Sequence, residues 1–148
     1  MRMKTTLSIA LLSCLLSVGV GTIANAQSAT QTRTASTRPL REDVDAKQAA
    51  SALQTQKNVV VLDVRTPDEY KKGHLKGAVN INLYDPNFSG KLAQLDKSKT
   101  YMVHCAAGLE NGRSRKATAV MDSLGFQRIK HLNGGFNAWQ QANLPVIK

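Results

Sequence analysis

From residue 40 onward, short apolar runs alternate with segments whose apolar residues recur every three or four positions. Val59 to Val64 is a nearly continuous β-branched run, which is typical of a strand that is covered on both faces of a sheet. Residues 100–104 and 128–132 are further apolar segments of strand length. We therefore predict three strands here, each followed by a polar or glycine-bearing loop.

Between the strands, apolar residues follow the three- and four-residue spacing of helices that bury one face. Asp45 and Gln48 carry the pattern of a capping box at the start of the first helix. Thr66, Pro67 and Glu69 carry a second one, with proline at the first helical position. Helical segments are predicted from residue 46, from residue 67, within 83–95, from residue 113 to a glycine cap at 125, and over 135–144. The alternation predicts an α/β domain with an open, mainly parallel sheet and helices on both faces.

The first 39 residues differ from the rest. Residues 1–4 are basic, residues 7–23 are mostly apolar, and Ala24 and Ala26 provide a small-residue site before Gln27, which is the layout of a cleaved secretory signal. Serines and glycines interrupt the apolar run, so it is a weak membrane anchor. Residues 27–39 have little to bury. We predict a signal peptide over 1–26, a disordered linker over 27–39, a folded domain over 40–148, a periplasmic location and no stable membrane anchor.

Composition narrows the possible partners. The net charge is +10, but the basic residues are scattered and aromatic residues do not interleave with them, which argues against nucleic acid and leaves anionic surfaces or a small anionic substrate. Cys14 lies in the predicted signal, so Cys105 would be the single thiol of the exported domain. An unpaired thiol in an oxidising compartment favours a chemical role. The histidines show no metal-ligand spacing, and we expect no metal, no cofactor and a monomer.

Cys105 ends an apolar strand, and a glycine-bearing loop leads from it to Arg113 at the start of a helix. Loop amides and the positive end of that helix can converge on the sulfur. A thiol has a pKa of about 8.5, and a helix N-terminus beside arginine can lower it by one or more units. Cys105 is therefore a candidate nucleophile, although a buried cysteine can also be an ordinary small core residue.

Two segments flank this loop in the sequence. Residues 63–81 read D-V-R-T-P-D-E-Y-K-K-G-H-L-K-G-A-V-N-I, and residues 134–139 read G-G-F-N-A-W. They resemble the two signatures of rhodanese-type sulfurtransferase domains, D-V-R-x-x-x-E-Y-x-x-G-H-[IL]-x-G-A-x-N-I and G-G-[FY]-x-x-W. Cys105 falls where that family keeps its nucleophile. The resemblance implies a single rhodanese-like domain and a two-step reaction. Cys105 would take the outer sulfur of an anionic donor such as thiosulfate, hold it as a persulfide, and pass it to a thiol or to cyanide.

The resemblance also implies roles for the neighbouring residues. Arg113 is the candidate for binding the donor oxyanion. The other expected substrate-binding residues belong to the loop and the helix start: Ala106, Ala107, Gly108, Gly112 and Ser114. Four residues of the first signature have structural interpretations instead. Asp63 and Arg65 are predicted to form an ion pair, Glu69 to close a helix end, and His74 to fix a turn.

The loop departs from the family pattern C-x-x-G-x-R-S. Arg113 follows Cys105 by eight positions instead of five, an expansion of three residues. The expansion contains Glu110, which we expect to face outward because its charge would oppose a thiolate. The same residues resemble the cysteine phosphatase signature H-C-x5-R-[ST], with seven intervening residues in place of five. A phosphatase or other oxyanion enzyme, and a catalytically silent rhodanese-like binding or redox module, are therefore the alternatives.

Overall fold

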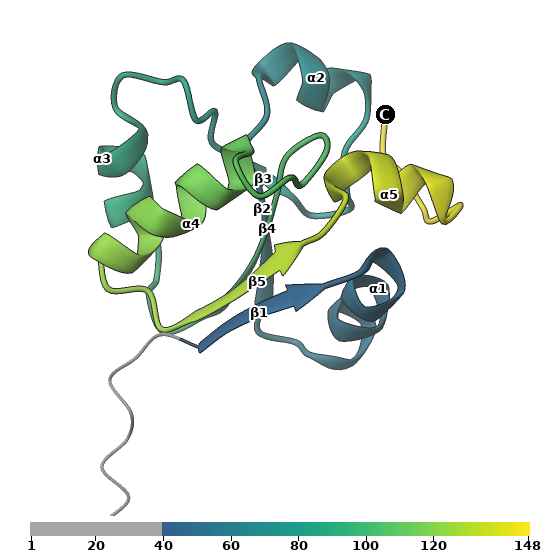
Figure 1. Cartoon of the computed structure of the whole chain (residues 1–148), viewed down its shortest axis with the longest axis horizontal. Coiled ribbons are helices and arrows are strands. Elements are labelled where there is room, and N and C mark those ends of the chain that lie inside the picture. Colours follow the sequence, from purple (N-terminus) through teal and green to yellow (C-terminus); the bar gives the residue numbers. More distant parts are fainter. Residues whose placement is uncertain (1–39) are drawn as a thin grey trace, which may run out of the picture. The chain divides into compact units, whose positions relative to one another are not determined.

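A computed structural model describes residues 40–148, which form a five-stranded parallel sheet with helices packed against it (Figure 1). The strand order is β1-β5-β4-β2-β3. The strands are β1 (Leu40–Val44), β2 (Val59–Asp63), β3 (Val79–Asn80), β4 (Thr100–His104) and β5 (Arg128–Leu132). The predicted signal peptide and linker, 1–26 and 27–39, lie outside the described residues. Within residues 40–148, no helix is long and apolar enough to cross a membrane.

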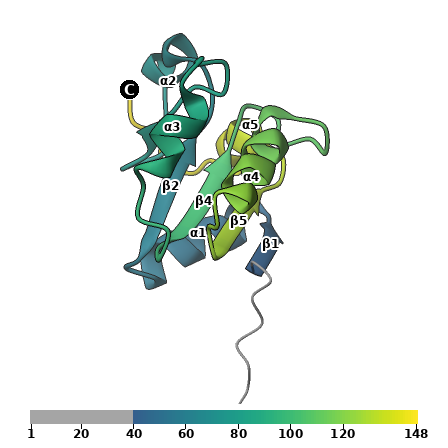
Figure 2. The ribbon, with the colours of Figure 1, turned by 90° about the vertical axis from the view of Figure 1, so that its left-hand side faces the viewer.

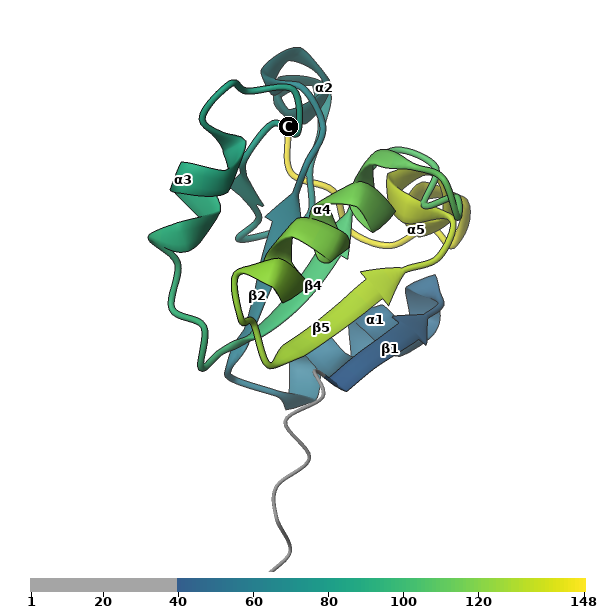
Figure 3. The ribbon, with the colours of Figure 1, turned by 60° about the vertical axis from the view of Figure 1, so that its left-hand side comes forward.

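The helices cover both faces of the sheet, as the alternation of elements predicts. Figure 3 shows α4 (Arg113–Ser123) in front of the sheet and α1 (Ala46–Thr55) behind it. The short helix α3 (Phe88–Ala93) packs on the same face as α4, and α5 (Gly135–Gln141) packs on the same face as α1 (Figure 2). The remaining helix, α2 (Pro67–Lys72), follows β2.

The core is divided between the two faces of the sheet. In β2, Leu62 packs beneath α3 and α4, whereas its neighbour Val61 packs towards α1 and α5. In β4, Val103 and Met102 divide in the same way. Successive side chains of a strand point to opposite faces, so a strand that is covered on both sides needs an unbroken apolar run. This explains the run that begins at Val59.

Both predicted capping boxes are present. Asp45 accepts a hydrogen bond from the Gln48 amide at 2.8 Å, and the Gln48 side chain accepts one from the Asp45 amide at 2.9 Å. Thr66 and Glu69 make the corresponding pair of contacts at the start of α2. Gly125 has a left-handed φ of 84° and follows Leu124, the C-cap of α4, as expected of a glycine that ends a helix.

Two strands and one helix end differ from the sequence prediction. The charged strand β1 exposes four of its five residues, because it pairs only with β5 at the edge of the sheet. The other missed strand, β3, is only two residues long. The sequence pattern predicts that the last helix continues to Leu144, but it ends at Gln141, and Asn143 beyond it has a φ of 54°.

The beginning of α5 is bonded directly to the cysteine loop, by which we mean residues 105–112. The amides of Phe136 and Asn137 donate to the carbonyl oxygens of Cys105 and Ala106 at 2.8 and 2.9 Å. A Cβ atom on Gly135 would lie 2.4 Å from the Cys105 oxygen, and Gly135 has a φ of +56°. Glycine is therefore required at Gly135 both by conformation and by space.

The close approach of Gly135 to the cysteine loop predicts how a substitution there changes the free energy of unfolding. Gly135→Ala adds left-handed strain of about 1–2 kcal/mol and also an overlap with backbone. Gly77→Ala is the matched control, because Gly77 has a φ of +73° but no atom lies within 4 Å of the place that its Cβ would occupy. We expect Gly135→Ala to lose about 1–3 kcal/mol more of the free energy of unfolding than Gly77→Ala does in urea titrations. Equal losses would show that the close approach carries no energetic weight.

Candidate active site

Cys105 follows the last residue of β4, at the carboxyl end of the parallel sheet. Ligands of open parallel sheets bind beyond this end of the strands. The Cys105 residue is only 3% exposed. Because α5 holds the Cys105 and Ala106 carbonyl groups, those oxygens face α5, away from the inside of the cysteine loop. The loop amides are thereby left free to approach the sulfur.

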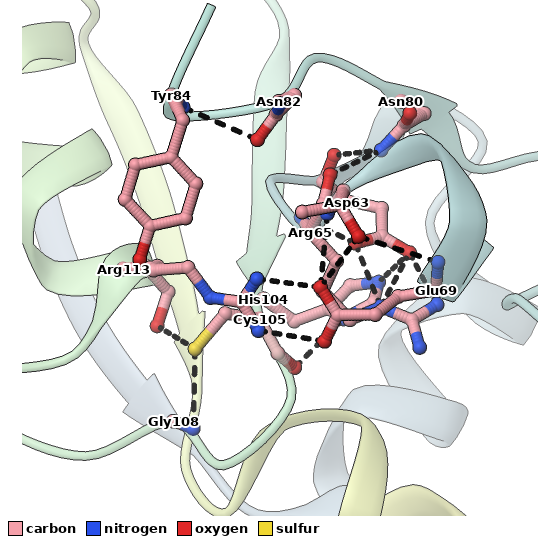
Figure 4. A network of polar contacts seen from close by, with 12 residues as sticks. Asp63, Arg65, Glu69, Asn80, Asn82, Tyr84, His104, Cys105, Gly108 and Arg113 are labelled. Carbon is pink, nitrogen blue, oxygen red and sulfur yellow. Dashed lines mark hydrogen bonds and ion pairs between the residues drawn. The ribbon is translucent and has the colours of Figure 1, made fainter.

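Hydrogen-bond donors surround the Cys105 sulfur. The Gly108 amide donates to Sγ at 3.4 Å (Figure 4), and the Ser114 hydroxyl lies 3.3 Å from it. Burial alone raises the pKa of the Cys105 thiol. Hydrogen bonds from the Ser114 hydroxyl and from the amides of Ser114, Gly108 and Ala107 outweigh burial and lower that pKa below its ordinary value. The arrangement therefore favours a thiolate, as the sequence predicts for a nucleophile.

The other expected loop residues have different surroundings. Gly112 precedes α4 and donates its amide hydrogen to the Leu109 carbonyl at 2.9 Å, closing a turn in the cysteine loop. Ala106 and Gly112 both line the pocket described below. Glu110 lies outward, with 82% of its side chain exposed, and bonds Arg115 at 2.7 Å. The loop therefore keeps the negative charge of Glu110 away from the sulfur, as expected.

Arg113 forms a two-pronged ion pair with Glu69. Nη1 of Arg113 lies 2.6 Å from Oε2 of Glu69, and Nη2 lies 2.8 Å from Oε1 (Figure 4). These hydrogen bonds from Arg113, together with those from Thr66, lower the pKa of Glu69 to about 2. Glu69 closes the start of α2 as predicted, but the sequence interpretation missed its second partner. The pair fixes the guanidinium beside the cysteine loop and leaves some of its N–H groups for a ligand.

An open pocket of about 270 Å³ lies beside Cys105. Its lining consists of Tyr84, Cys105, Ala106, Ala107, Leu109, Asn111, Gly112, Arg113 and Lys116. Two cations and no carboxylate belong to this set, so the pocket suits a small anion. Tyr84 and Leu109 form an apolar rim and are 67% and 66% exposed. The sequence interpretation did not assign Tyr84, Leu109, Asn111 or Lys116 to the site.

The predicted ion pair between Asp63 and Arg65 is present and buried. Nη2 of Arg65 lies 2.6 Å from Asp63 and 2.8 Å from the Gly73 carbonyl oxygen, and the guanidinium stacks 4.0 Å from the centre of the Phe136 ring. This pair joins β2, the end of α2 and α5 behind the site. Its contacts are those of a structural element, as expected.

His74 fixes the segment after α2, as expected. Its Nδ1 lies 3.2 Å from the Tyr70 carbonyl oxygen, its ring stacks 3.9 Å from that of Tyr70, and its backbone pairs with Ile147. His74 does not line the pocket beside Cys105. Within residues 40–148, no group of three His, Cys, Asp or Glu side chains is placed to hold a metal ion.

The sequence interpretation named Ser114 but missed its partner His131 and the neighbour of that histidine, Asp43. The Ser114 hydroxyl, which contacts the Cys105 sulfur, also lies 2.8 Å from Nε2 of His131. Nδ1 of His131 lies 3.2 Å from Asp43 on β1. His131 occupies the same face of β5 as the core residue Ile129 and is 2% exposed. A polar residue on an apolar strand face was the available signal.

The fold and the cysteine loop define an α/β domain with a buried cysteine at the carboxyl end of its sheet. Residues 45–142 match the rhodanese-like domain family, and the chain belongs to this family. It is 36% identical over 95 residues to thiosulfate sulfurtransferase 16 of Arabidopsis thaliana chloroplasts, covering 57% of this chain and 77% of the relative. It is 32% identical over 87 residues to the thiosulfate sulfurtransferase GlpE of Shewanella oneidensis, covering 59% and 81%.

Solved structures agree with this assignment. The rhodanese-like domain of an Anabaena protein superposes with a TM-score of 0.64 at 26% identity, over 73% of this chain and 80% of that one. A rhodanese-related protein from Thermoplasma volcanium superposes with a TM-score of 0.62 at 27% identity, over 72% and 97%.

The pair between Glu69 and Arg113 predicts a pH dependence of stability. The folded-state pKa of Glu69 is about 2, below its ordinary value of 4.5. The stability from this ionised group is therefore fully present above about pH 4.5 and is lost as the pH falls towards 2. We expect wild type to exceed Glu69→Gln in free energy of unfolding at pH 7, with the difference shrinking on acidification. Asp68→Asn controls for the other first-turn carboxylate of α2, and a difference that stays constant from pH 7 to pH 3 would contradict the assignment.

Proposed function

We propose that this protein is an exported sulfurtransferase that moves sulfane sulfur from a small anionic donor, such as thiosulfate, through a persulfide on Cys105 to a thiol or cyanide. The observation that carries the proposal is the set of amide and hydroxyl donors around the Cys105 sulfur, beside a cationic pocket. Relatives named thiosulfate sulfurtransferase support rhodanese-type sulfur transfer in general.

In the first step, the Cys105 thiolate attacks the outer sulfur of the donor. A new S–S bond forms to Sγ, the S–S bond within thiosulfate breaks, and sulfite leaves with the electron pair. The donor carries negative charge throughout, and the persulfide that forms is also anionic. The loop amides and the N-terminus of α4 are fixed before the reaction, so they stabilise these anions without reorganising.

In the second step, cyanide or an acceptor thiolate attacks the outer sulfur of the persulfide. The bond between that sulfur and Sγ breaks, and Cys105 leaves as the thiolate. The same donors that lower the pKa of the thiol make Cys105 a better leaving group here. One site therefore serves both half-reactions, and the enzyme returns to its starting state.

Arg113 is the proposed binding residue for the donor oxyanion. Glu69 holds its guanidinium at the pocket wall, and Lys116 adds a second cation to the lining. The pocket favours sulfur transfer over phosphate-ester hydrolysis, because a phosphatase needs a carboxylic acid for its leaving group and none lines the pocket. The lowered pKa of the Cys105 thiol favours an active site over a silent module.

Steady-state kinetics with thiosulfate and cyanide test this proposal. Cys105→Ser is expected to abolish turnover while the fold is retained. Arg113→Ala is expected to raise the KM for thiosulfate tenfold or more, since a charged hydrogen bond contributes about 1.5–3 kcal/mol. Glu69→Gln is the matched control, because it removes the partner of Arg113 but keeps the cation, and its KM should rise less. Wild-type activity in Cys105→Ser would overturn the proposal, and an unchanged KM in Arg113→Ala would overturn the role of Arg113.

The proposed export rests on the first 26 residues of the sequence, which have the layout of a cleaved signal. A bacterial host expressing the full chain should release it into the periplasmic fraction with Gln27 as the first residue, as read by N-terminal sequencing. Protein found only in membranes, with Met1 still present, would contradict export and cleavage.

A further inference from the structure

A line of polar contacts leads from the Cys105 sulfur to β1. The Ser114 hydroxyl lies 3.3 Å from Sγ and 2.8 Å from Nε2 of His131. Nδ1 of His131 lies 3.2 Å from Oδ1 of Asp43 and 3.2 Å from Oδ1 of Asn133. Ser114 and His131 are 0% and 2% exposed, so water does not compete freely for these contacts.

Asp43 determines where the protons of this line reside. A hydrogen bond from Arg115 lowers the pKa of Asp43, so its carboxylate stays ionised and can only accept. Nδ1 of His131 must therefore carry a hydrogen, and a neutral imidazole then has its lone pair on Nε2. Nε2 accepts from the Ser114 hydroxyl, which leaves an oxygen lone pair to accept the S–H of Cys105. The thiol thus donates to Ser114, Ser114 donates to Nε2 of His131, and Nδ1 of His131 donates to Asp43.

We propose that His131 takes up the proton of Cys105 through Ser114, with Asp43 orienting its ring. The thiol proton moves to the Ser114 oxygen as the Ser114 hydroxyl proton moves to Nε2. The products are a thiolate, an intact serine hydroxyl that now donates to it, and an imidazolium bonded to Asp43, with no change in net charge. His131 touches no substrate and acts as a positioning residue. This inference rests on the proposed function, because the proton transfer would produce the thiolate that attacks the sulfur donor.

The surroundings of His131 suit a base that starts neutral. Burial lowers the pKa of His131, the Arg115 cation lowers it further, and Asp43 opposes both. These are the charged groups that contact the ring from α4 and β1, and its neighbour on β4 is Val103. A cavity of about 50 Å³ beside His131 is also lined by Arg41 and Glu42. Their charges are compensated, because Arg41 pairs with Asp122 and Glu42 with Lys130.

Arg115 also connects this line to the expanded part of the cysteine loop. The same Nη2 atom lies 2.8 Å from Asp43 and 2.7 Å from Glu110. The expansion is thereby bonded to the residue that orients His131. Glu110 stands outside the pocket and still belongs to the network that reaches the sulfur.

The pH dependence of Cys105 alkylation tests the inference. The full chain is treated with iodoacetamide at a series of pH values, and modification of the Cys105 peptide is followed by mass spectrometry, which separates it from Cys14. His131→Gln can still bond Ser114 but cannot hold the proton. We expect its alkylation midpoint to rise by at least one pH unit, or about tenfold slower reaction at neutral pH. Ser114→Ala should shift the midpoint similarly, and the double variant should add no further shift because the residues act in series.

His74→Gln is the matched control, because this histidine lies outside the line of contacts, and its midpoint should equal that of wild type. An unchanged midpoint in folded His131→Gln overturns the inference, as does a double variant whose shift is the sum of the two single shifts. If His131→Gln does not fold, Asp43→Asn replaces it, since Asp43 lies on the exposed edge strand. Asp43→Asn should raise the alkylation midpoint by a smaller amount than His131→Gln, and an unchanged midpoint in this variant would also overturn the inference. Alkylation needs no sulfur donor, so this outcome is independent of whether thiosulfate is turned over.

Discussion

The site depends on the bonding between the first turn of α5 and the cysteine loop. Amides of Phe136 and Asn137 hold the carbonyl groups of Cys105 and Ala106, which turns those oxygens away from the sulfur. The loop and α5 can approach this closely because Gly108 and Gly135 both have left-handed backbones. A Cβ atom at either residue would lie within 3 Å of neighbouring backbone atoms, so only glycine fits. A backbone arrangement of this kind fixes donors in place before any ligand arrives, which is the requirement for stabilising an anion efficiently.

Side-chain pairs then attach the rest of the domain to that loop. The ion pair of Glu69 with Arg113 joins the start of α2 to the start of α4, so that one carboxylate both caps a helix and holds the cation beside the pocket. His131 connects β5 to the cysteine loop through the Ser114 hydroxyl, which contacts both His131 and the Cys105 sulfur. These contacts connect α2, which follows β2, and the carboxyl end of β5 to the loop and helix that follow β4, although the three regions are distant in sequence.

Local patterns in the sequence predicted the parts of this structure that are encoded locally. The apolar run from Val59 follows from burial on both faces, and the capping boxes and the pair of Asp63 with Arg65 join residues two or three positions apart. The edge strand β1 was missed because its charged residues leave no apolar period. The bonds of Glu69 with Arg113 and of Ser114 with His131 span 44 and 17 positions, and spacing alone cannot indicate such partners.

Sulfur transfer through Cys105 requires that this residue carries sulfur covalently. Mass spectrometry of the native protein, after exposure to thiosulfate and removal of the excess donor, measures this. We expect a mass increase of one sulfur atom, located on the Cys105 peptide and discharged when cyanide is added. A folded protein that gains no sulfur, or that gains it equally in Cys105→Ser, would show that Cys105 is not the sulfur carrier.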